Sequence, residues 1–310
     1  MVATIQVNKQ SIKRLLESGK EQMFLIPEYQ RPYSWTENET KTLFYDLLEF
    51  TENESKKNSE VEGTYFLGSI VSYENEEGEQ EIIDGQQRIT SLFLLLRAIY
   101  TKLTSYEEKT VEQENFIRQI QPALWKQEKL TGEVDYTSVL ITSRVIDNEG
   151  NKILQDILET GIADHKRMDN YSKNYNQILK LIEEKSVENA LMIYQFIYAL
   201  LNQVIILPIT ADSQETALTI FSTLNDRGLP LSDADIFKAK IYNHLKSKEE
   251  KEEEDKRVWY KLKDYYALGY DDDKAEELHQ KDWKKFMTAS KDVLPQYDIF
   301  RTLIRKKLFL

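Results

Sequence analysis

Five consecutive residues carry the clearest chemical signal: Asp84, Gly85, Gln86, Gln87 and Arg88. They separate a short β-forming run from a strongly apolar helical segment. A helix N-terminus offers free backbone N–H groups, and a glycine beside it lets an anion approach closely. Arg88 adds a fork of donors for phosphate oxygens, while Asp84 can bind a divalent metal or orient water. Gln86 and Gln87 could position that water or read a base edge. The pattern therefore predicts a phosphate-binding turn with catalytic residues.

A purely structural reading of the same turn is equally compatible with the residue spacing. Gly85 would close a strand-to-helix turn, Asp84 would cap the helix, and Arg88 would pair with Asp84 at the surface. The spacing matches neither a P-loop nor the glycine fingerprint of dinucleotide-binding proteins. The residues alone therefore leave both interpretations open.

A second candidate region is the segment Ile26–Trp35, in which two prolines exclude a helix and restrict the backbone. It carries Tyr29, Gln30 and Arg31, followed by a further tyrosine and a tryptophan. Aromatic and guanidinium groups on such a loop suit base stacking or phosphate contact. Composition favours the alternative, in which the aromatic residues pack on the core and Arg31 is a surface cation.

The third candidate region is the segment Phe221–Lys240, where a glycine turn lies between two helical stretches. A capped corner between two helices explains one group of its residues, namely Gly228, Ser232 and Asp235. That interpretation leaves a polar triplet unexplained, namely Asn225, Asp226 and Arg227. The triplet is therefore a candidate binding element.

Other catalytic chemistries have less support in the sequence. The three histidines, His165, His244 and His279, are far apart and show no metal-binding spacing, so a zinc site is not expected. The chain contains no cysteine, which excludes disulfides, thiolate metal sites and cysteine nucleophiles. No nuclease motif built on histidine is present in the 310 residues.

The elements that must position these residues follow from local patterns. Thr36 and Glu39 form a capping-box pattern, which predicts a helix start directly after the proline-containing loop. The run 65–73 is rich in β-branched and aromatic residues, and Gly78 provides a turn before the chain returns. We therefore expect a β-hairpin that ends at Asp84.

The remainder of the chain is expected to be largely helical. A short strand is expected at 137–142, and the β-forming run 204–210 is expected to rejoin the first sheet as a buried strand. These patterns predict four segments: a core at 1–104, a helical insertion at 105–202, a return segment that completes the core at 203–245, and a charged helical region at 246–310.

Composition limits the functional classes. With 41 Lys and Arg against 53 Asp and Glu, the net charge is -12, which excludes a protein that coats DNA through bulk positive charge. No apolar run is long enough to span a bilayer, so no membrane partner is expected. The lack of cysteine suits a reducing compartment, and we expect a cytoplasmic protein.

Three motifs in order resemble one family. The stretches IPEYQRPYSW, YFLGSIV leading into IIDGQQRITSL, and FSTLNDRGLPLSDADIFKAK resemble the N-terminal domain of GmrSD-type modification-dependent restriction systems. The DGQQR turn is similar to the phosphate-binding turn of the ParB and sulfiredoxin-like fold. The resemblance implies an α+β fold with a ParB-like mixed sheet, a large helical insertion and a helical C-terminal region.

The resemblance also implies a function. A GmrS-like domain is expected to bind and hydrolyse a nucleoside triphosphate with Mg²⁺ and to sense DNA, which can be modified. It implies that the Asp84–Arg88 turn holds the triphosphate and the metal, that Arg31 closes on it with Tyr29 and Gln30, and that the Asn225–Arg227 triplet completes the pocket. The nuclease is expected to be a missing domain or a separate subunit, and a homo-oligomer is compatible with the sequence. The alternatives are a nucleotide- or DNA-binding module without hydrolysis and an acidic interaction scaffold.

Overall fold

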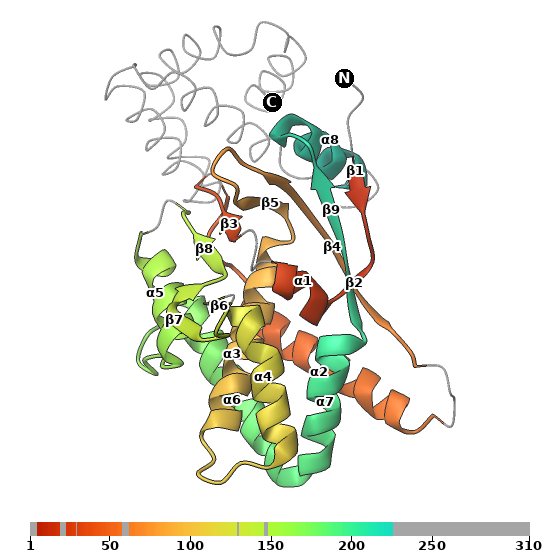
Figure 1. Cartoon of the computed structure of the whole chain (residues 1–310), viewed down its shortest axis with the longest axis vertical. Helices are drawn as coiled ribbons and strands as arrows, with labels where there is room; N and C mark the ends of the chain where they lie inside the picture. Colours follow the sequence, from red (N-terminus) through yellow and green to blue (C-terminus); the bar gives the residue numbers. More distant parts are fainter. Residues whose placement is uncertain are drawn as a thin grey trace, which may run out of the picture. The chain divides into compact units, whose positions relative to one another are not determined.

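The computed structural model describes residues 5–18, 23–28, 30–57, 62–128, 130–145 and 148–225 (Figure 1). The chain divides into two compact units, Met1–Leu231 and Ser232–Leu310. All described residues belong to the first unit. The predicted charged helical region at 246–310 therefore lies outside the described residues, as does the part of the return segment after residue 225.

A seven-stranded mixed sheet forms the framework of this unit. Its strands are β1 (Ile5–Val7), β2 (Gln10–Ser11), β3 (Phe24–Ile26), β4 (Tyr65–Glu74), β5 (Gln80–Asp84), β8 (Ile141–Ser143) and β9 (Val204–Ala211). The order is β1-β9-β4-β5-β3-β8, and β2 also pairs with β9. β4 runs antiparallel to β5 and parallel to β9, while β3 is parallel to both of its neighbours. The mixed sheet confirms the predicted α+β class, whereas the ParB-like assignment stays a prediction.

The described residues form eight helices. They are α1 (Ile12–Ser18), α2 (Glu37–Ser55), α3 (Gln86–Thr104), α4 (Val111–Leu124), α5 (Asn148–Thr160), α6 (Asn170–Glu188), α7 (Ala190–Asn202) and α8 (Gln214–Asn225). A two-stranded sheet of β6 (Trp125–Gln127) and β7 (Val134–Val139) follows α4. Figure 1 shows α2, α3, α4, α6 and α7 gathered beyond one end of the sheet, while α8 lies beside β9. None of the described helices is long and apolar enough to cross a membrane.

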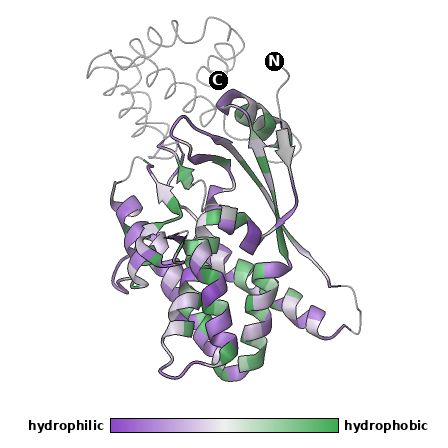
Figure 2. Ribbon diagram, in the orientation of Figure 1, coloured by the Kyte–Doolittle hydropathy of each residue, from purple (hydrophilic) through white to green (hydrophobic). Residues whose placement is uncertain are grey.

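Helix α3 forms the centre of the main hydrophobic core. Its leucines and other apolar residues are distributed around the whole helix, so it is buried on nearly every side. Ile70, Ile82 and Ile206 belong to the same core as α3. Strand β9 is hydrophobic along most of its length, as expected of a strand whose residues are mostly buried (Figure 2).

Several predicted elements are present. The hairpin that ends at Asp84 corresponds to β4 and β5, and the predicted buried return strand is β9, which pairs with β4. The single strand expected at 137–142 is two strands, β7 and β8, divided at Leu140. β8 pairs with β3 in the main sheet, so the predicted helical insertion also contributes a strand. The predicted segment boundaries themselves stay predictions.

A buried arginine joins α3 to the C-terminal end of α5. Only 6% of Arg97 is exposed, and its Nε donates to the Leu158 carbonyl at 2.8 Å. The guanidinium lies over the rings of Tyr100 and Trp125, at 5.4 and 5.2 Å from their centroids. Burial lowers the pKa of Arg97 from its ordinary value. The cation therefore satisfies helix-terminal carbonyls where the helix dipole favours positive charge.

We expect Arg97→Met to lower the free energy of unfolding by about 2–3 kcal/mol, because the substitution leaves buried carbonyl groups without donors. Urea denaturation measures this change. Arg118→Met on the exposed surface of α4 is the matched control and should change stability by less than about 0.5 kcal/mol. Equal effects of the two substitutions would show that Arg97 has no special structural role.

Candidate functional site

The turn between β5 and α3 has a backbone geometry that requires glycine. Gly85 adopts φ 89° and ψ 7°, in the left-handed region, and is the N-cap of α3. A Cβ atom there would lie 2.9 Å from Ile70 Cγ1 and 3.1 Å from the Ser69 carbonyl oxygen. Any larger residue therefore meets both backbone strain and a clash with β4. This constraint starts α3 immediately after the strand.

The N-terminus of α3 has no side-chain cap among the described residues. The first helical hydrogen bond runs from Ile89 N to the Gly85 carbonyl at 3.0 Å, so the preceding N–H groups have no carbonyl one turn earlier in the helix. Asp84 does not cap the helix, contrary to the structural interpretation of the motif. Such an N-terminus combines free donors with the positive end of the helix dipole, which favours an anion.

Asp84 and Arg88 form an ion pair beside this N-terminus. Arg88 Nη2 lies 3.7 Å from Asp84 Oδ2, and the two side chains are 24% and 31% exposed, respectively. This pairing is the third part of the structural interpretation, and it is present. The distance is too long for a hydrogen bond, so the pair leaves the Arg88 donors and the carboxylate oxygens in partial contact with solvent.

Arg88 is seated against a glycine that the sequence analysis did not select. The pairing of β4 with β9 shifts register between Phe66 and Gly68, and Gly68 adopts φ 127°. A Cβ atom on Gly68 would collide with the Arg88 guanidinium. The signal was an isolated glycine within a β-forming run, which is typical of a bulge or of a close approach to the backbone. Gly68 thus provides the space that Arg88 occupies.

The proline-containing loop is attached to the turn at two points. Gln30 Nε2 donates to the Ile83 carbonyl at 2.9 Å, directly before Asp84. On the other side, Gln87 Oε1 accepts from the backbone N–H groups of Ser34 at 2.7 Å and Trp35 at 3.1 Å. The loop is therefore fixed on both sides of Arg31, whose side chain is exposed.

Two aromatic residues of this loop, Tyr33 and Trp35, pack in or against the core, as composition favoured. Tyr33 is buried, its hydroxyl lies 2.6 Å from Ser91 Oγ, and Asn174 Nδ2 donates to it at 3.0 Å. Burial raises the pKa of Tyr33 above its ordinary value. The ring stacks on Tyr171 with centroids 4.8 Å apart. Helix α6 thus holds the loop together with α3.

Two predicted site residues have side chains that face the interior. Gln86 and Gln87 are each 7% exposed, and the Gln87 amide bonds to the proline-containing loop. Their predicted catalytic roles stay predictions. Thr36 is the N-cap of α2, and its capping box with Glu39 is present. The sequence indicated this box, but it did not indicate that Gln87 would hold the loop that precedes it.

Several predicted residues lie outside the part of the chain that the structure describes. These are Tyr29, Asp226, Arg227, Gly228, Ser232 and Asp235, while Asn225 is the last residue of α8 and its side chain is not described. The described residues place Asp84, Gly85, Gln86, Gln87, Arg88, Gln30 and Arg31 in one region. Completion of the pocket by the Asn225–Arg227 triplet stays a prediction.

Among the described residues of the turn, Asp84 is the one carboxylate that could bind a metal. Within the described ranges, no three histidine, aspartate or glutamate side chains group as a metal site. Asp84 alone fits the way Mg²⁺ is often held in phosphate-binding sites, by one or two carboxylates together with oxygens of the bound phosphates.

A comparison with protein families shows which family the chain belongs to. The model of the GmrSD restriction endonuclease N-terminal domain matches residues 12–242, about three quarters of the chain. The chain belongs to the GmrSD N-terminal domain family. A comparison with curated proteins finds no match. Membership connects this GmrSD N-terminal domain with a restriction system, and hence with DNA and a nuclease part.

The contact between Gly68 and Arg88 in the GmrSD N-terminal domain can be tested through stability. Gly68→Ala should lower the free energy of unfolding by about 1–3 kcal/mol, because the new methyl group meets positive φ and the guanidinium. In an Arg88→Ala background the same substitution should cost about 0.5 kcal/mol less, since no guanidinium has to move aside. Chemical denaturation of the four proteins measures this coupling. Additive effects would contradict the contact.

The attachment of the loop by Gln87 can be tested by amide hydrogen exchange. Gln87→Leu removes the acceptor for the Ser34 and Trp35 N–H groups, so exchange at both amides should accelerate about tenfold or more. Amides in the middle of α2 provide the internal control and should keep their protection. Uniform acceleration across the domain would instead indicate global destabilisation.

Proposed function

We propose that this GmrSD N-terminal domain binds a nucleoside triphosphate at the Asp84–Arg88 turn and hydrolyses it with Mg²⁺. The observation that carries the proposal is the uncapped N-terminus of α3 beside Arg88, whose guanidinium lies against Gly68. Backbone donors and an arginine beside them are groups that bind phosphate.

Each residue of the turn has a role in this proposal. Gly85 brings the backbone close to the phosphates, and Arg88 supplies donors to their oxygens. Asp84 would hold Mg²⁺ together with phosphate oxygens, and the bound metal neutralises phosphate charge. Because Asp84 and Arg88 are 3.7 Å apart without a hydrogen bond, a phosphate can engage the arginine without breaking a strong contact.

The proline-containing loop supplies the second cation of the proposed site. Gln30 and Gln87 hold the loop on both sides of Arg31, which supports a position of its exposed guanidinium close to the bound phosphates. In this proposal Gln87 is a positioning residue that acts through the loop. Asn225, Asp226 and Arg227 are proposed to complete the pocket, together with Tyr29.

In the restriction system, the domain is proposed to act as the nucleotide-dependent regulatory and DNA-sensing part. The net charge of -12 is compatible with this role only if DNA meets local basic groups or a partner subunit. Cleavage is assigned to a nuclease domain or subunit. We propose a cytoplasmic site of action, where foreign DNA and nucleotides are both available.

A second candidate function is nucleotide sensing without hydrolysis. The observation that favours it is the single carboxylate at the turn, since no group of three metal-ligating side chains occurs among the described residues. A turn with one acidic residue can bind Mg²⁺-nucleotide without activating water. The two candidates share the binding site and differ in turnover.

Phosphate release from several nucleoside triphosphates, with Mg²⁺ and with or without modified DNA, tests the first proposal. Arg88→Ala and Asp84→Asn should each lower the rate about 100-fold, because each removes an electrostatic contact to the reacting phosphates. Arg118→Ala on α4 and Asp156→Asn on α5, both exposed, are matched controls and should retain the rate.

Calorimetry with the same nucleotides separates the outcomes. Saturable binding without phosphate release under any of these conditions would replace the first candidate by the second. Absence of binding, or variants that keep the full rate, would contradict a nucleotide site at this turn.

A further inference from the structure

The loop between α5 and α6, residues 161–169, carries a run of basic residues. His165, Lys166 and Arg167 follow one another, and nowhere else in the described ranges do three basic residues occur in a row. All three are exposed. In a chain whose net charge is -12, this basic loop is a local exception to the overall acidic character. It provides the local cations that an acidic protein needs in order to meet a polyanion.

The ion pairs around the basic loop leave its cations accessible to a ligand. Lys166 pairs with no carboxylate among the described residues. Arg167 pairs with Glu149 at 3.0 Å, but the two side chains are 42% and 76% exposed, respectively. Ion pairs that are this exposed to water contribute little. A phosphate group can therefore compete with Glu149 for the arginine.

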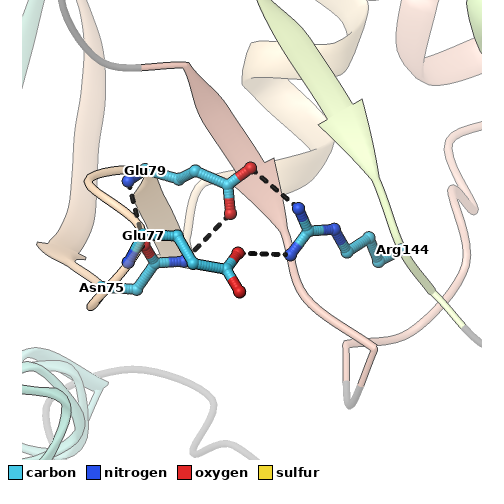
Figure 3. Close-up of polar contacts among 4 residues, drawn as sticks. All are labelled: Asn75, Glu77, Glu79 and Arg144. Carbon is cyan, nitrogen blue, oxygen red and sulfur yellow. Dashed lines mark hydrogen bonds and ion pairs between the residues drawn. The ribbon is translucent and has the colours of Figure 1, made fainter.

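Arg144, which follows β8, shows the opposite situation (Figure 3). Its guanidinium lies 3.2 Å from Glu77 and 2.9 Å from Glu79, on the turn between β4 and β5. Asn75 fixes this turn, because its Oδ1 accepts from Glu77 N at 3.0 Å and from Glu79 N at 2.9 Å. Two carboxylates already neutralise this arginine, so a phosphate would be repelled there.

Two long apolar side chains flank the basic run at the surface. Ile162 is 74% exposed and Met168 is 76% exposed. A free phosphate gains nothing from apolar side chains, whereas nucleic acid presents sugars and bases between its phosphates. Isoleucine and methionine are among the apolar residues that proteins insert into the grooves of DNA. Cations beside exposed apolar groups therefore favour nucleic acid over a small anion.

The conformation of the basic loop is fixed at both ends and in the middle. Gly161 has φ 71°, and its carbonyl accepts from the Tyr175 hydroxyl at 2.9 Å. In the middle, Arg167 N donates to the Asp164 carbonyl at 3.1 Å. Asp169 is the N-cap of α6 and accepts from a backbone N–H of the first turn. A preformed loop lowers the entropic cost of binding.

The start of α6 joins the basic loop to the proline-containing loop. Asn170 Nδ2 donates to the Tyr33 carbonyl at 3.4 Å, and the ring of Tyr171 stacks on that of Tyr33. The proline-containing loop also carries Arg31. The basic loop is therefore attached, through the first residues of α6, to a loop of the proposed triphosphate site.

We propose that the basic loop contacts the phosphate backbone of duplex DNA. Lys166 and Arg167 would each bind a phosphate, while Ile162 and Met168 would lie against the sugars. The proposal rests on the DNA-sensing role proposed above and names the surface that meets the DNA. Phosphate contacts of this kind position a duplex without reading its sequence. The surface shares no residue with the turn at 84–88.

Fluorescence anisotropy of the full chain with a short labelled DNA duplex tests the proposal. The double variant Lys166→Ala/Arg167→Ala should weaken binding about tenfold or more, and it should reduce the slope of log affinity against log salt concentration by about 2. The matched control Arg118→Ala/Lys180→Ala removes the same charge from exposed positions of α4 and α6 and should bind normally. Thermal unfolding of both double variants verifies that they fold.

Three outcomes would overturn the proposal: no binding of the duplex by the wild-type chain, equal affinities of the two double variants, or tighter binding of an RNA duplex of the same sequence. Equal affinities would refute this surface alone, whereas no wild-type binding would also refute the DNA-sensing role. Failure at the triphosphate turn is separable from both. Lys166→Ala/Arg167→Ala should keep the rate of phosphate release without DNA, and Arg88→Ala should keep DNA binding.

Discussion

The close contact between Gly85 and β4 is the constraint on which the candidate site depends. With Ile70 Cγ1 2.9 Å from where a Cβ would lie, the chain can pass from β5 into α3 only through a residue without a side chain. This passage places the helix N-terminus directly at the end of the strand. It also places Gln87 where it can hold the proline-containing loop, and Arg88 where it meets Gly68. One backbone conformation thus brings three separate stretches of sequence together.

The site is accordingly an arrangement of backbone supported by buried side chains. Gln87 and Asn174 use amide groups to hold the proline-containing loop from α3 and α6, and Tyr33 fills the space between these helices. The charged side chains, exposed Arg31 and partly buried Arg88, are not part of this amide network. The charged residues are therefore available to bind a ligand, while the amide hydrogen bonds keep the loop rigid.

Local patterns in the sequence were sufficient to predict the helices and strands but not the long-range contacts between them. The capping box at Thr36, the hairpin ending at Asp84 and the return strand β9 depend on neighbouring residues or on simple periodicity, and they were predictable. The roles of Gly68, Gln87 and Arg97 depend on partners 20 to 62 residues away. A glutamine that bonds to a loop and one that faces solvent have the same sequence signature. The split of one expected strand into β7 and β8 likewise depends on pairing with β6 and β3, which the local pattern does not contain.

The position of β9 between β1 and β4 delays completion of the sheet while the chain is being synthesised. β1 pairs only with β9 in this sheet, and Ile5 is opposite Ala211, so the two partners are about 200 residues apart in the chain. During translation β4 and β1 therefore present unpaired edges until the ribosome has released nearly all of the described chain. Long-range pairing of this kind slows folding, and open edges promote association with other chains. Nascent chains of this domain therefore carry these open edges until β9 has been synthesised.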